Sequence, residues 1–445
     1  MKIYLESLGC SRNQIDSETM LGRLTAQGHE ISHDPALAEA IIVNTCGFIS
    51  TASEEAVDTI LELADHKKTG KCRRLIVTGC LAQRFKEDTL ASSLPEVDAF
   101  LGTGAVDAIV QAVEGEGEKI LTLFPDIQDR DFQGFPLPRQ LTLDYSAFVK
   151  VSEGCDRKCT YCIIPELRGL QRSRSVEDIV AEAEHLFSRG VKELILVGEN
   201  TTDYGSDLGW DTELSDILTR ISHKAREVCR DETVWIRLLY THPSSLSEKI
   251  IKTMARLDNV CSYYDVPVQH ASSPVLKKMG RHYTEEDLYS LFALIRRLDP
   301  KAALRTTLIT GFPGETEADF QVLHRFIKRI AFDHVGVFTY SDSEDLGSHR
   351  LKNHVSKELA TQRYDVLMAE QVKISETINE KHFGKTCSVL VEENPDEGIY
   401  LGRTRFQAPD VDGITFIYGT GLEIGTFVDV TITETHEYDL AGEAV

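Results

Sequence analysis

The chain of 445 residues is long enough for two or three domains, and its 42% apolar and 27% charged residues are typical of a globular protein. Its formal net charge of −23 disfavours nucleic acid as a partner and favours a basic polypeptide. No apolar run approaches the ~18–20 residues that span a bilayer, and the N-terminus lacks a signal-peptide core. We therefore expect a cytoplasmic protein, not bound to a membrane, whose ten cysteines are metal ligands, catalytic thiols or buried residues rather than disulfides.

The first part of the chain, residues 1–117, alternates short apolar segments with helical patterns. Such alternation predicts an α/β domain, in which a parallel sheet is covered by helices on both faces. The helical stretch at 53–64 places Ala56, Ile60 and Leu63 on one face. We expect the strands at Ile3–Leu8, Ala40–Asn44, Arg74–Thr78 and Val97–Leu101.

Residues 118–140, a proline-containing stretch behind an acidic glycine run, are expected to be a linker. Residues 141–370 repeat the strand–helix alternation, which predicts a partial (β/α)6 barrel whose chemistry lies at the carboxyl ends of its strands. We expect those strands at Ala147–Ser152, Glu193–Val197, Val234–Tyr240, Tyr263–Val268, Ala303–Thr310 and His334–Tyr340. Several helices should begin at a Ser or Thr cap with an acid three residues later, namely at Ser175, Ser245, Thr284 and Thr316. Residues 373–441 contain short, glycine-broken β segments, which predict a small antiparallel barrel.

Three cysteines, here called the core triad, directly follow the first barrel strand as Cys155-x3-Cys159-x2-Cys162. This spacing in a loop lets three thiolates converge on one point, as soft metals and iron–sulfur clusters require. Three ligands leave one iron of a four-iron cluster without a protein thiolate, so that a small molecule can coordinate there. The alternatives are a structural zinc site without its fourth ligand and three reduced cysteines without a role.

Three further cysteines, here called the N-terminal triad, each end an expected strand of the first domain: Cys10, Cys46 and Cys80. They are too far apart for a local motif, but the carboxyl ends of parallel strands share one edge, where ligands bind. The glycine beside each of them is expected to let the backbone approach a bulky cluster. Any single one of them could instead be a buried structural thiol. The remaining cysteines are expected to be structural: Cys72, Cys229, Cys261 and Cys387.

These two triads make the chain similar to the radical S-adenosylmethionine (SAM) methylthiotransferases. The core triad, with Tyr161 before its last cysteine, resembles the radical-SAM signature. The resemblance covers essentially the whole chain as a cluster-binding domain, a radical-SAM core and a TRAM domain. Within the family, several segments resemble the RimO type more than the tRNA-modifying MiaB type: Ser7–Glu18, Ser152–Cys155, Cys162–Gly169, Gln269–Ser272, Val335–Ser341 and Ala408–Gly413. Ser11-Arg12, where Pro-Lys is usual in RimO, and Thr160 depart from that pattern.

The resemblance implies two 4Fe-4S clusters and SAM as cofactors, and an electron donor as a partner. A cluster on the core triad would bind SAM and cleave it to a 5′-deoxyadenosyl radical, and a cluster on the N-terminal triad would supply sulfur. The product would carry a methylthio group on the β-carbon of an aspartate in small-subunit ribosomal protein twelve. No catalytic residue beyond the cluster ligands is expected.

The resemblance also suggests contacts to SAM, through Tyr161, Gly198, Glu199 and Gly311. Glu199 would pair with the methionine ammonium, or be a solvated residue at a strand end. Gly311 begins a stretch that resembles one flanking adenine, or a plain turn. Arginines after the core triad would hold a carboxylate of SAM or of an acidic substrate, or else face solvent; they are Arg168, Arg172 and Arg174.

Residues 385–445 carry 12 acidic and 3 basic side chains. A TRAM domain that holds tRNA should present cations to phosphates, whereas this charge suits a basic ribosomal protein. Alternatively, the acidity serves the solubility of the whole chain. The rival functions are a tRNA adenosine methylthiotransferase of the MiaB or MtaB type and a non-catalytic iron–sulfur scaffold.

Overall fold

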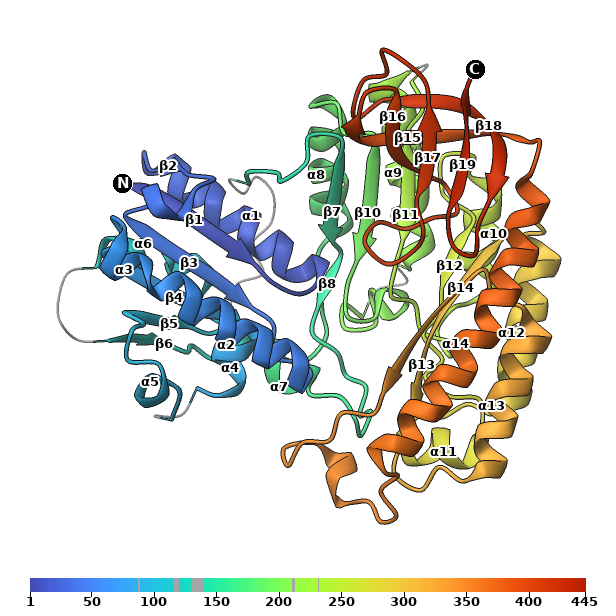
Figure 1. Cartoon of the computed structure of the whole chain (residues 1–445), viewed down its shortest axis with the longest axis horizontal. Helices are drawn as coiled ribbons and strands as arrows, with labels where there is room; N and C mark the ends of the chain where they lie inside the picture. Colours follow the sequence, from blue (N-terminus) through green and yellow to red (C-terminus); the bar gives the residue numbers. More distant parts are fainter. Residues whose placement is uncertain (87–88, 116–119, 130–138, 210–212, 231) are drawn as a thin grey trace.

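The computed structural model describes residues 1–86, 89–115, 120–129, 139–209, 213–230 and 232–445. Figure 1 shows three units in chain order: a blue sheet domain, a curved layer of strands and helices from green to orange, and a small red barrel. This mixed α/β architecture is the predicted one. Within the described residues, no helix combines the length and the apolar character needed to cross a bilayer.

The N-terminal domain is a parallel sheet with the strand order β2-β1-β3-β4-β5-β6. Its strands are β1 (Lys2–Ser7), β2 (Glu30–Ile31), β3 (Ala40–Thr45), β4 (Arg74–Gly79), β5 (Ala99–Leu101) and β6 (Leu121–Leu123). Helices α1 (Ser11–Ala26) and α6 (Ile109–Glu114) cover one face, and α2 (Ser50–Ala64) covers the other, burying the three apolar side chains that its periodicity predicted. Shorter helices complete the domain: α3 (His66–Thr69), α4 (Cys80–Arg84) and α5 (Thr89–Ser93).

The two outer strands of this sheet, β2 and β6, differ from the prediction. β6 lies in the stretch 118–140 that was expected to be a linker, and it pairs in parallel with β5. Strands of two or three residues carry too little alternation to be recognised, because hydrogen bonding to a sheet edge defines them. Residues 118–119 and 130–138 of that expected linker lie outside the described residues.

The core consists of two three-stranded parallel sheets, β7-β10-β11 and β12-β13-β14, which lie side by side as one curved layer. The strands are β7 (Ser146–Lys150), β10 (Glu193–Val197), β11 (Trp235–Leu238), β12 (Tyr263–Asp265), β13 (Ala303–Thr310) and β14 (His334–Thr339). The two sheets are linked at β11, where Ile236 forms an isolated parallel bridge with Val260 and its N–H donates to the carbonyl oxygen of Asn259 at 2.8 Å. Because β7 and β14, the outer strands of this layer, do not pair with each other, the barrel is partial, as predicted.

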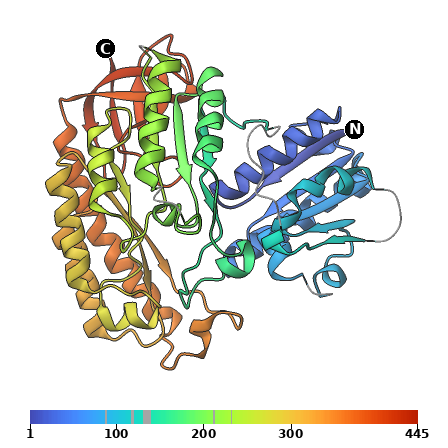
Figure 2. The same cartoon turned by 180° about the vertical axis from the view of Figure 1, so that it is seen from behind.

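Helices cover the outer face of this curved layer (Figure 2). They include α8 (Val176–Ser188), α9 (Leu214–Cys229), α10 (Glu248–Arg256), α12 (Glu285–Leu298), α13 (Glu317–Ile330) and α14 (Lys357–Asn379). Ser175, Thr284 and Thr316 cap their helices as predicted. α10 begins after Ser247 rather than Ser245: the side chain of Ser247 accepts from the N–H of Ile250, whereas the hydroxyl of Ser245 is hydrogen-bonded to that of Thr202 at 2.9 Å.

Two further details of the core differ from the prediction. β12 ends at Asp265 rather than at residue 268, and Pro267 has no N–H to extend the ladder. A short antiparallel ribbon, β8 (Ser152–Glu153) with β9 (Arg172–Ser173), holds together the two ends of the loop that carries the core triad. Strands of two residues are too short to show a periodic pattern of apolar side chains, so this ribbon could not be predicted from the sequence.

The C-terminal unit is a closed barrel with the strand order β15-β16-β17-β19-β18. Its strands are β15 (Thr386–Asp396), β16 (Ile399–Thr404), β17 (Thr415–Tyr418), β18 (Phe427–Thr435) and β19 (Leu440–Ala444). All neighbouring pairs are antiparallel except β17 with β19. Leu390 and Ala408 of this barrel join a buried apolar cluster with Ile195, Trp235 and Tyr263 of the core strands. The C-terminal barrel therefore covers the inner face of the open core layer.

A buried ion pair fixes this contact between the two barrels. Glu193 of β10 is 0% exposed and accepts hydrogen bonds from Nε of Arg237 at 2.7 Å and from Nη2 of Arg403 at 2.5 Å. Burial alone would raise the pKa of Glu193, but Arg403 and Arg237 lower it from 4.5 to about 2. The carboxylate is therefore charged at neutral pH and holds β10, β11 and β16 together.

We predict that Glu193→Gln lowers the free energy of unfolding by about 3–5 kcal/mol, because it leaves the buried guanidinium of Arg237 without a counter-charge and that of Arg403 with Glu392 alone. Since folding depresses the pKa of Glu193, its stabilisation is present above pH 4.5 and is lost as the pH falls toward about 2. The difference between wild type and variant should shrink over that range in urea unfolding. As a control, Glu232→Gln removes an exposed ion pair with Lys192 and should change little. Equal stabilities of Glu193→Gln and wild type at pH 7 would contradict this account.

Candidate active site

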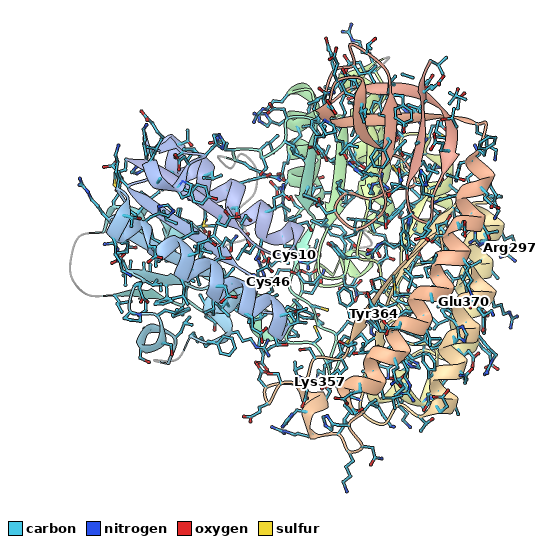
Figure 3. All side chains as sticks on the ribbon, in the orientation of Figure 1. Cys10, Cys46, Arg297, Lys357, Tyr364 and Glu370 are labelled. Carbon is cyan, nitrogen blue, oxygen red and sulfur yellow. The ribbon has the colours of Figure 1, made fainter. Side chains whose placement is uncertain are left out.

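The N-terminal triad lies at the carboxyl edge of its sheet. Cys10 stands between β1 and α1, Cys46 directly follows β3, and Cys80 is the first residue of α4, which follows β4. Figure 3 shows Cys10 and Cys46 together at the end of the N-terminal domain that faces the core. The topology of parallel strands therefore gathers cysteines that are far apart in the sequence.

Glycines beside these cysteines serve the packing of the triad's own loops. A Cβ on Gly9, where φ is +95°, would lie 2.8 Å from Cβ of Cys46. A Cβ on Gly47 would lie 2.7 Å from Cα of Leu81, in the helix that begins at Cys80. Protein atoms fill the space that side chains at these glycines would take, so the loops themselves require glycine, and the approach of the backbone to a cluster stays a prediction.

The core triad occupies the loop that follows β8. The N–H of Cys155 donates to the carbonyl oxygen of Gly169 at 3.0 Å, and the N–H of Cys162 donates to that of Cys159 at 3.1 Å. The N–H of Arg157 lies 3.4 Å from Sγ of Cys155 and donates to it. These bonds, with the β8–β9 ribbon, hold the loop closed.

All six cysteines line one cavity of about 530 Å³ between the N-terminal domain and the core. The remaining walls come from α1 and α2, from the helix at 164–168, from the core strands and the loops that follow them, and from residues 409–411 of the C-terminal barrel. In the described part of the chain, no three His, Cys, Asp or Glu side chains meet the geometry of a single-ion site. The fit to iron–sulfur clusters therefore rests on the shared cavity and on a donor set made of thiols.

Burial sets the ionisation of most of these thiols. It raises the pKa of Cys80 and of Cys155 to about 11, and that of Cys162 to about 12. Cys10 differs: burial alone would raise its pKa, but Arg12 and Arg168 hold it below its ordinary value. Because metal ligation requires thiolates, loading of the site should release protons.

Arg168 joins the core to the N-terminal triad. It ends α7 (Ile164–Arg168) and is 2% exposed. Its Nη1 donates to Asp16 at 2.6 Å and to Glu153 at 2.7 Å, and its Nη2 donates to Asn13 at 2.5 Å and to Sγ of Cys80 at 3.8 Å. The expectation that Arg168 holds a carboxylate of SAM or of a substrate is therefore wrong, because both terminal nitrogens are engaged within the protein.

Four other expected residues are not among those that line this cavity: Gly198, whose contact with SAM stays a prediction, Arg172, Arg174 and Gly311. Arg174 gives its guanidinium to two carboxylates of α8, each at 2.6 Å, so its expected role as a carboxylate anchor is wrong. Arg172 lies in the β8–β9 ribbon. Gly311 packs closely against Ala360 of α14, and its contact with SAM stays a prediction.

Glu199, two residues after the end of β10, lines the cavity. Its Oε2 accepts a hydrogen bond from the N–H of Gly154 at 2.8 Å. Its Oε1 lies 3.5 Å from Nε of Arg12 and accepts no hydrogen bond among the described residues. Arg12 also donates to the carbonyl oxygen of Gly198 at 3.1 Å. Burial, opposed by Arg12, raises the pKa of Glu199. Such an oxygen suits an ammonium ligand.

Arg281 and His242 line the cavity but were not found from the sequence. Arg281 donates from Nε and Nη2 to the hydroxyl of Tyr161 at 3.0 and 2.6 Å. Its Nη1 and the Nε2 of His242 are buried without a hydrogen-bond partner among the described residues. Burial and the nearby Arg281 and Arg157 lower the pKa of His242 to about 2, so that its ring is neutral. Glu199 and Arg281 together offer an acceptor and a donor to an amino-acid ligand.

The sequence contains one signal for Arg281, the glycine before it. Gly280 has a φ of +76°, and a Cβ on it would lie 2.6 Å from the carbonyl oxygen of Lys158. Glycine is therefore needed where the turn after α11 (Ser273–Lys278) packs against the core-triad loop. Only the fold shows which loop that turn meets.

The four cysteines expected to be structural are not among those that line this cavity: Cys72, Cys229, Cys261 and Cys387. Cys261 is 0% exposed in the apolar cluster on the inner face of the core. The thiol of Cys72 donates to the carbonyl oxygen of Arg74 at 3.3 Å.

Solved structures share this fold at low sequence identity. TsrM from Kitasatospora setae, a radical S-adenosylmethionine methyltransferase with cobalamin and a [4Fe-4S] cluster bound, matches with a TM-score of 0.55 and 13% identity over 76% of this chain and 72% of its own. OxsB, a cobalamin-dependent S-adenosylmethionine radical enzyme, matches with a TM-score of 0.53 and 13% identity over 84% and 56%. These likenesses concern the fold alone.

Family models match three stretches of the chain: the uncharacterized protein family UPF0004 at residues 2–102, the Radical SAM superfamily at 149–327 and the TRAM domain at 383–445. Relatives match over full length. "Ribosomal protein uS12 methylthiotransferase RimO" of Desulfosudis oleivorans is 49% identical, covering 100% of both chains. The protein of the same name from Clostridioides difficile is 46% identical, covering 100% of this chain and 99% of its own. The chain therefore belongs to the RimO family of radical-SAM methylthiotransferases.

Proposed function

We propose that this chain adds a methylthio group to the β-carbon of an aspartate in ribosomal protein uS12. The observation that carries this proposal is the single cavity in which cysteine triads from two domains meet. SAM and two 4Fe-4S clusters are the cofactors, one cluster on each triad, and an external donor supplies electrons. We place the reaction in the cytoplasm, with a ribosomal protein as the substrate.

When bound, the core-triad cluster supplies the electron that cleaves SAM to a 5′-deoxyadenosyl radical, and the other cluster supplies sulfur. The protein's own residues bind and orient SAM. Oε1 of Glu199 accepts a hydrogen bond from its ammonium, and Nη1 of Arg281 donates to its carboxylate, as the open positions of both side chains allow. Tyr161 holds Arg281 in place through the other two guanidinium nitrogens.

The C-terminal barrel favours a basic polypeptide over RNA. Of its three cations, Arg403 is buried against Glu193, and Arg405 donates to the carbonyl oxygens of Asp258 and Val260 at 2.8 Å. Lys385 is thus the one exposed cation in residues 385–445. Residues 409–411 also reach the cavity, so the same acidic barrel can contact a substrate bound there. Neutralisation of phosphates needs cations that this surface does not present.

Anaerobic reconstitution followed by mass spectrometry tests the proposal. We expect about eight irons per chain, that is, two four-iron clusters. With SAM and a reductant, we expect methylthiolated uS12 and unmodified tRNA. Methylthiolation of bulk tRNA with none on uS12 would favour the MiaB-type reading. Cluster transfer to apo-proteins without 5′-deoxyadenosine would favour a scaffold.

Substitution of one cysteine in each triad should distinguish the roles of the two triads. We predict that Cys159→Ala abolishes formation of 5′-deoxyadenosine, because the core triad then has too few thiolates for its cluster. Cys46→Ala should keep 5′-deoxyadenosine formation and lose methylthiolated product. Liquid chromatography of the reconstituted reaction measures 5′-deoxyadenosine and the methylthiolated product. Cys261→Ala, which alters a thiol outside the cavity, is the control and should retain both products. Methylthiolated product from Cys46→Ala would mean that the N-terminal triad has another role.

The side chains of Glu199 and Arg281 should contribute to the affinity for SAM. We predict that Glu199→Gln and Arg281→Gln each weaken SAM binding about tenfold or more, since a hydrogen bond to a charged group contributes about 1.5–3 kcal/mol. Arg281→Lys keeps the charge and should recover part of the affinity. Equilibrium titration of the reconstituted enzyme with SAM, without reductant, measures the effect. Unchanged affinity in both Gln variants would show that the amino-acid part of SAM lies elsewhere.

A further inference from the structure

A segment of the core, residues 341–350 between β14 and α14, contacts the surroundings of both triads; we call it the strap. Figure 1 shows it in orange, reaching from the core toward the blue N-terminal domain. The N–H of Ser348 donates at 2.8 Å to the carbonyl oxygen of Thr160, which lies between two cysteines of the core triad. Leu346, 6% exposed, packs in an apolar cluster with Cys80, Ile163 and Leu167. One side chain of the strap thus lies between the two cysteine loops.

Arg84 fastens the strap to the N-terminal domain. It is the last residue of α4, the helix that begins with Cys80. Its Nε and Nη2 donate to the two carboxylate oxygens of Asp345, both at 2.7 Å, and its Nη2 also donates to Ser343 at 2.9 Å. Its Nη1 donates at 2.7 Å to the carbonyl oxygen of Gly47, the residue after Cys46. One guanidinium therefore connects the strap to the loops of Cys46 and Cys80.

This contact restricts how the two domains can move. A two-pronged guanidinium–carboxylate pair fixes direction as well as distance, which a single hydrogen bond does not. The Arg84 side chain is 5% exposed and that of Asp345 is 34% exposed, so water reaches the pair from the side of the carboxylate only. A second hydrogen bond across the same boundary joins the hydroxyls of Ser50 and Ser341 at 3.2 Å. The Arg168 contacts tie Asn13 and Cys80 to the core, and the strap adds a further connection at Arg84.

We propose that the strap sets the distance between the two triads, with Arg84, Asp345 and Leu346 as positioning residues. Its effect on catalysis rests on the proposed function, since a product that needs both triads requires them at a fixed separation. A displacement of about 1 Å can cost a factor of about a hundred in rate, so a loosened strap leaves SAM cleavage intact and uncouples it from product formation.

The test uses the reconstituted holoenzyme with Asp345→Asn and Leu346→Ala. Pulsed electron paramagnetic resonance of the two reduced clusters gives the distribution of distances between them, and we expect it to broaden in both variants. The amount of methylthiolated product per 5′-deoxyadenosine should fall about tenfold, with 5′-deoxyadenosine formation within about twofold of wild type. Asp342→Asn is the matched control, because Asp342 lies in the same strap but pairs with His349, also in the strap, at 2.9 Å. It should behave as wild type.

An unchanged distance distribution in both variants overturns the proposal. So does a loss of half the iron, which would show that the strap helps to build one cluster site and does not set a spacing. If Leu346→Ala does not fold, Arg84→Lys loosens the same contact, because lysine keeps the charge but loses the fork. If the wild type yields no methylthiolated uS12, the proposed function fails, while the distance comparison still decides the role of the strap.

Discussion

The arrangement of the active site depends on a buried charge network between the N-terminal domain and the core. The carboxylate of Asp16 in α1 forms ion pairs with Nη1 of Arg168 at 2.6 Å and with Nζ of Lys150 at 3.0 Å. The carboxylate of Glu153 forms ion pairs with the same two nitrogens, at 2.7 and 3.0 Å. None of the four side chains is more than 7% exposed. The charges of these two cations and two anions cancel, but a substitution that removes any one of the four leaves an unpaired charge in the interior. Because apolar residues could be equally stabilising, we infer that the network matters for the single orientation it permits.

The same network reaches the ligands of the N-terminal triad. Arg168 contacts Asn13, whose side-chain amide donates to the carbonyl oxygens of Leu8 and Thr45 at 2.9 and 3.0 Å. These two carbonyls lie just before Cys10 and Cys46. The bonds that dock the domain are thus continuous with the bonds that hold its cysteine loops, so that docking and ligand geometry cannot vary independently. Residues of this outer layer commonly tune metal sites almost as strongly as the ligands do.

The sequence predicted what regular backbone patterns determine. Cys10, Cys46 and Cys80 could be placed at one edge because each ends a strand of an alternating α/β pattern, and the core triad was recognised from its spacing. Side chains whose role arises from contacts between domains could not be found in this way. Because Arg168 follows the core triad in sequence, it was expected to bind a carboxylate of SAM or of a substrate. Its side chain instead contacts Asp16 and Asn13 of the N-terminal domain. Arg281 sits in an irregular turn, and the strap has no periodicity at all.

Although the chain is strongly acidic overall, the cavity contains arginines, one of which can bind the carboxylate of a ligand. Cavity arginines are paired with carboxylates at 3.5 Å or less, in the pairs Arg12–Glu199, Arg157–Asp203 and Arg305–Asp265. Arg281 instead contacts a tyrosine hydroxyl, which leaves its charge available to a carboxylate. Fixed pairs of this kind cost no reorganisation when a ligand enters. Cations are therefore concentrated and oriented inside the cavity, whereas the C-terminal barrel, which reaches the same cavity, carries an excess of acidic side chains.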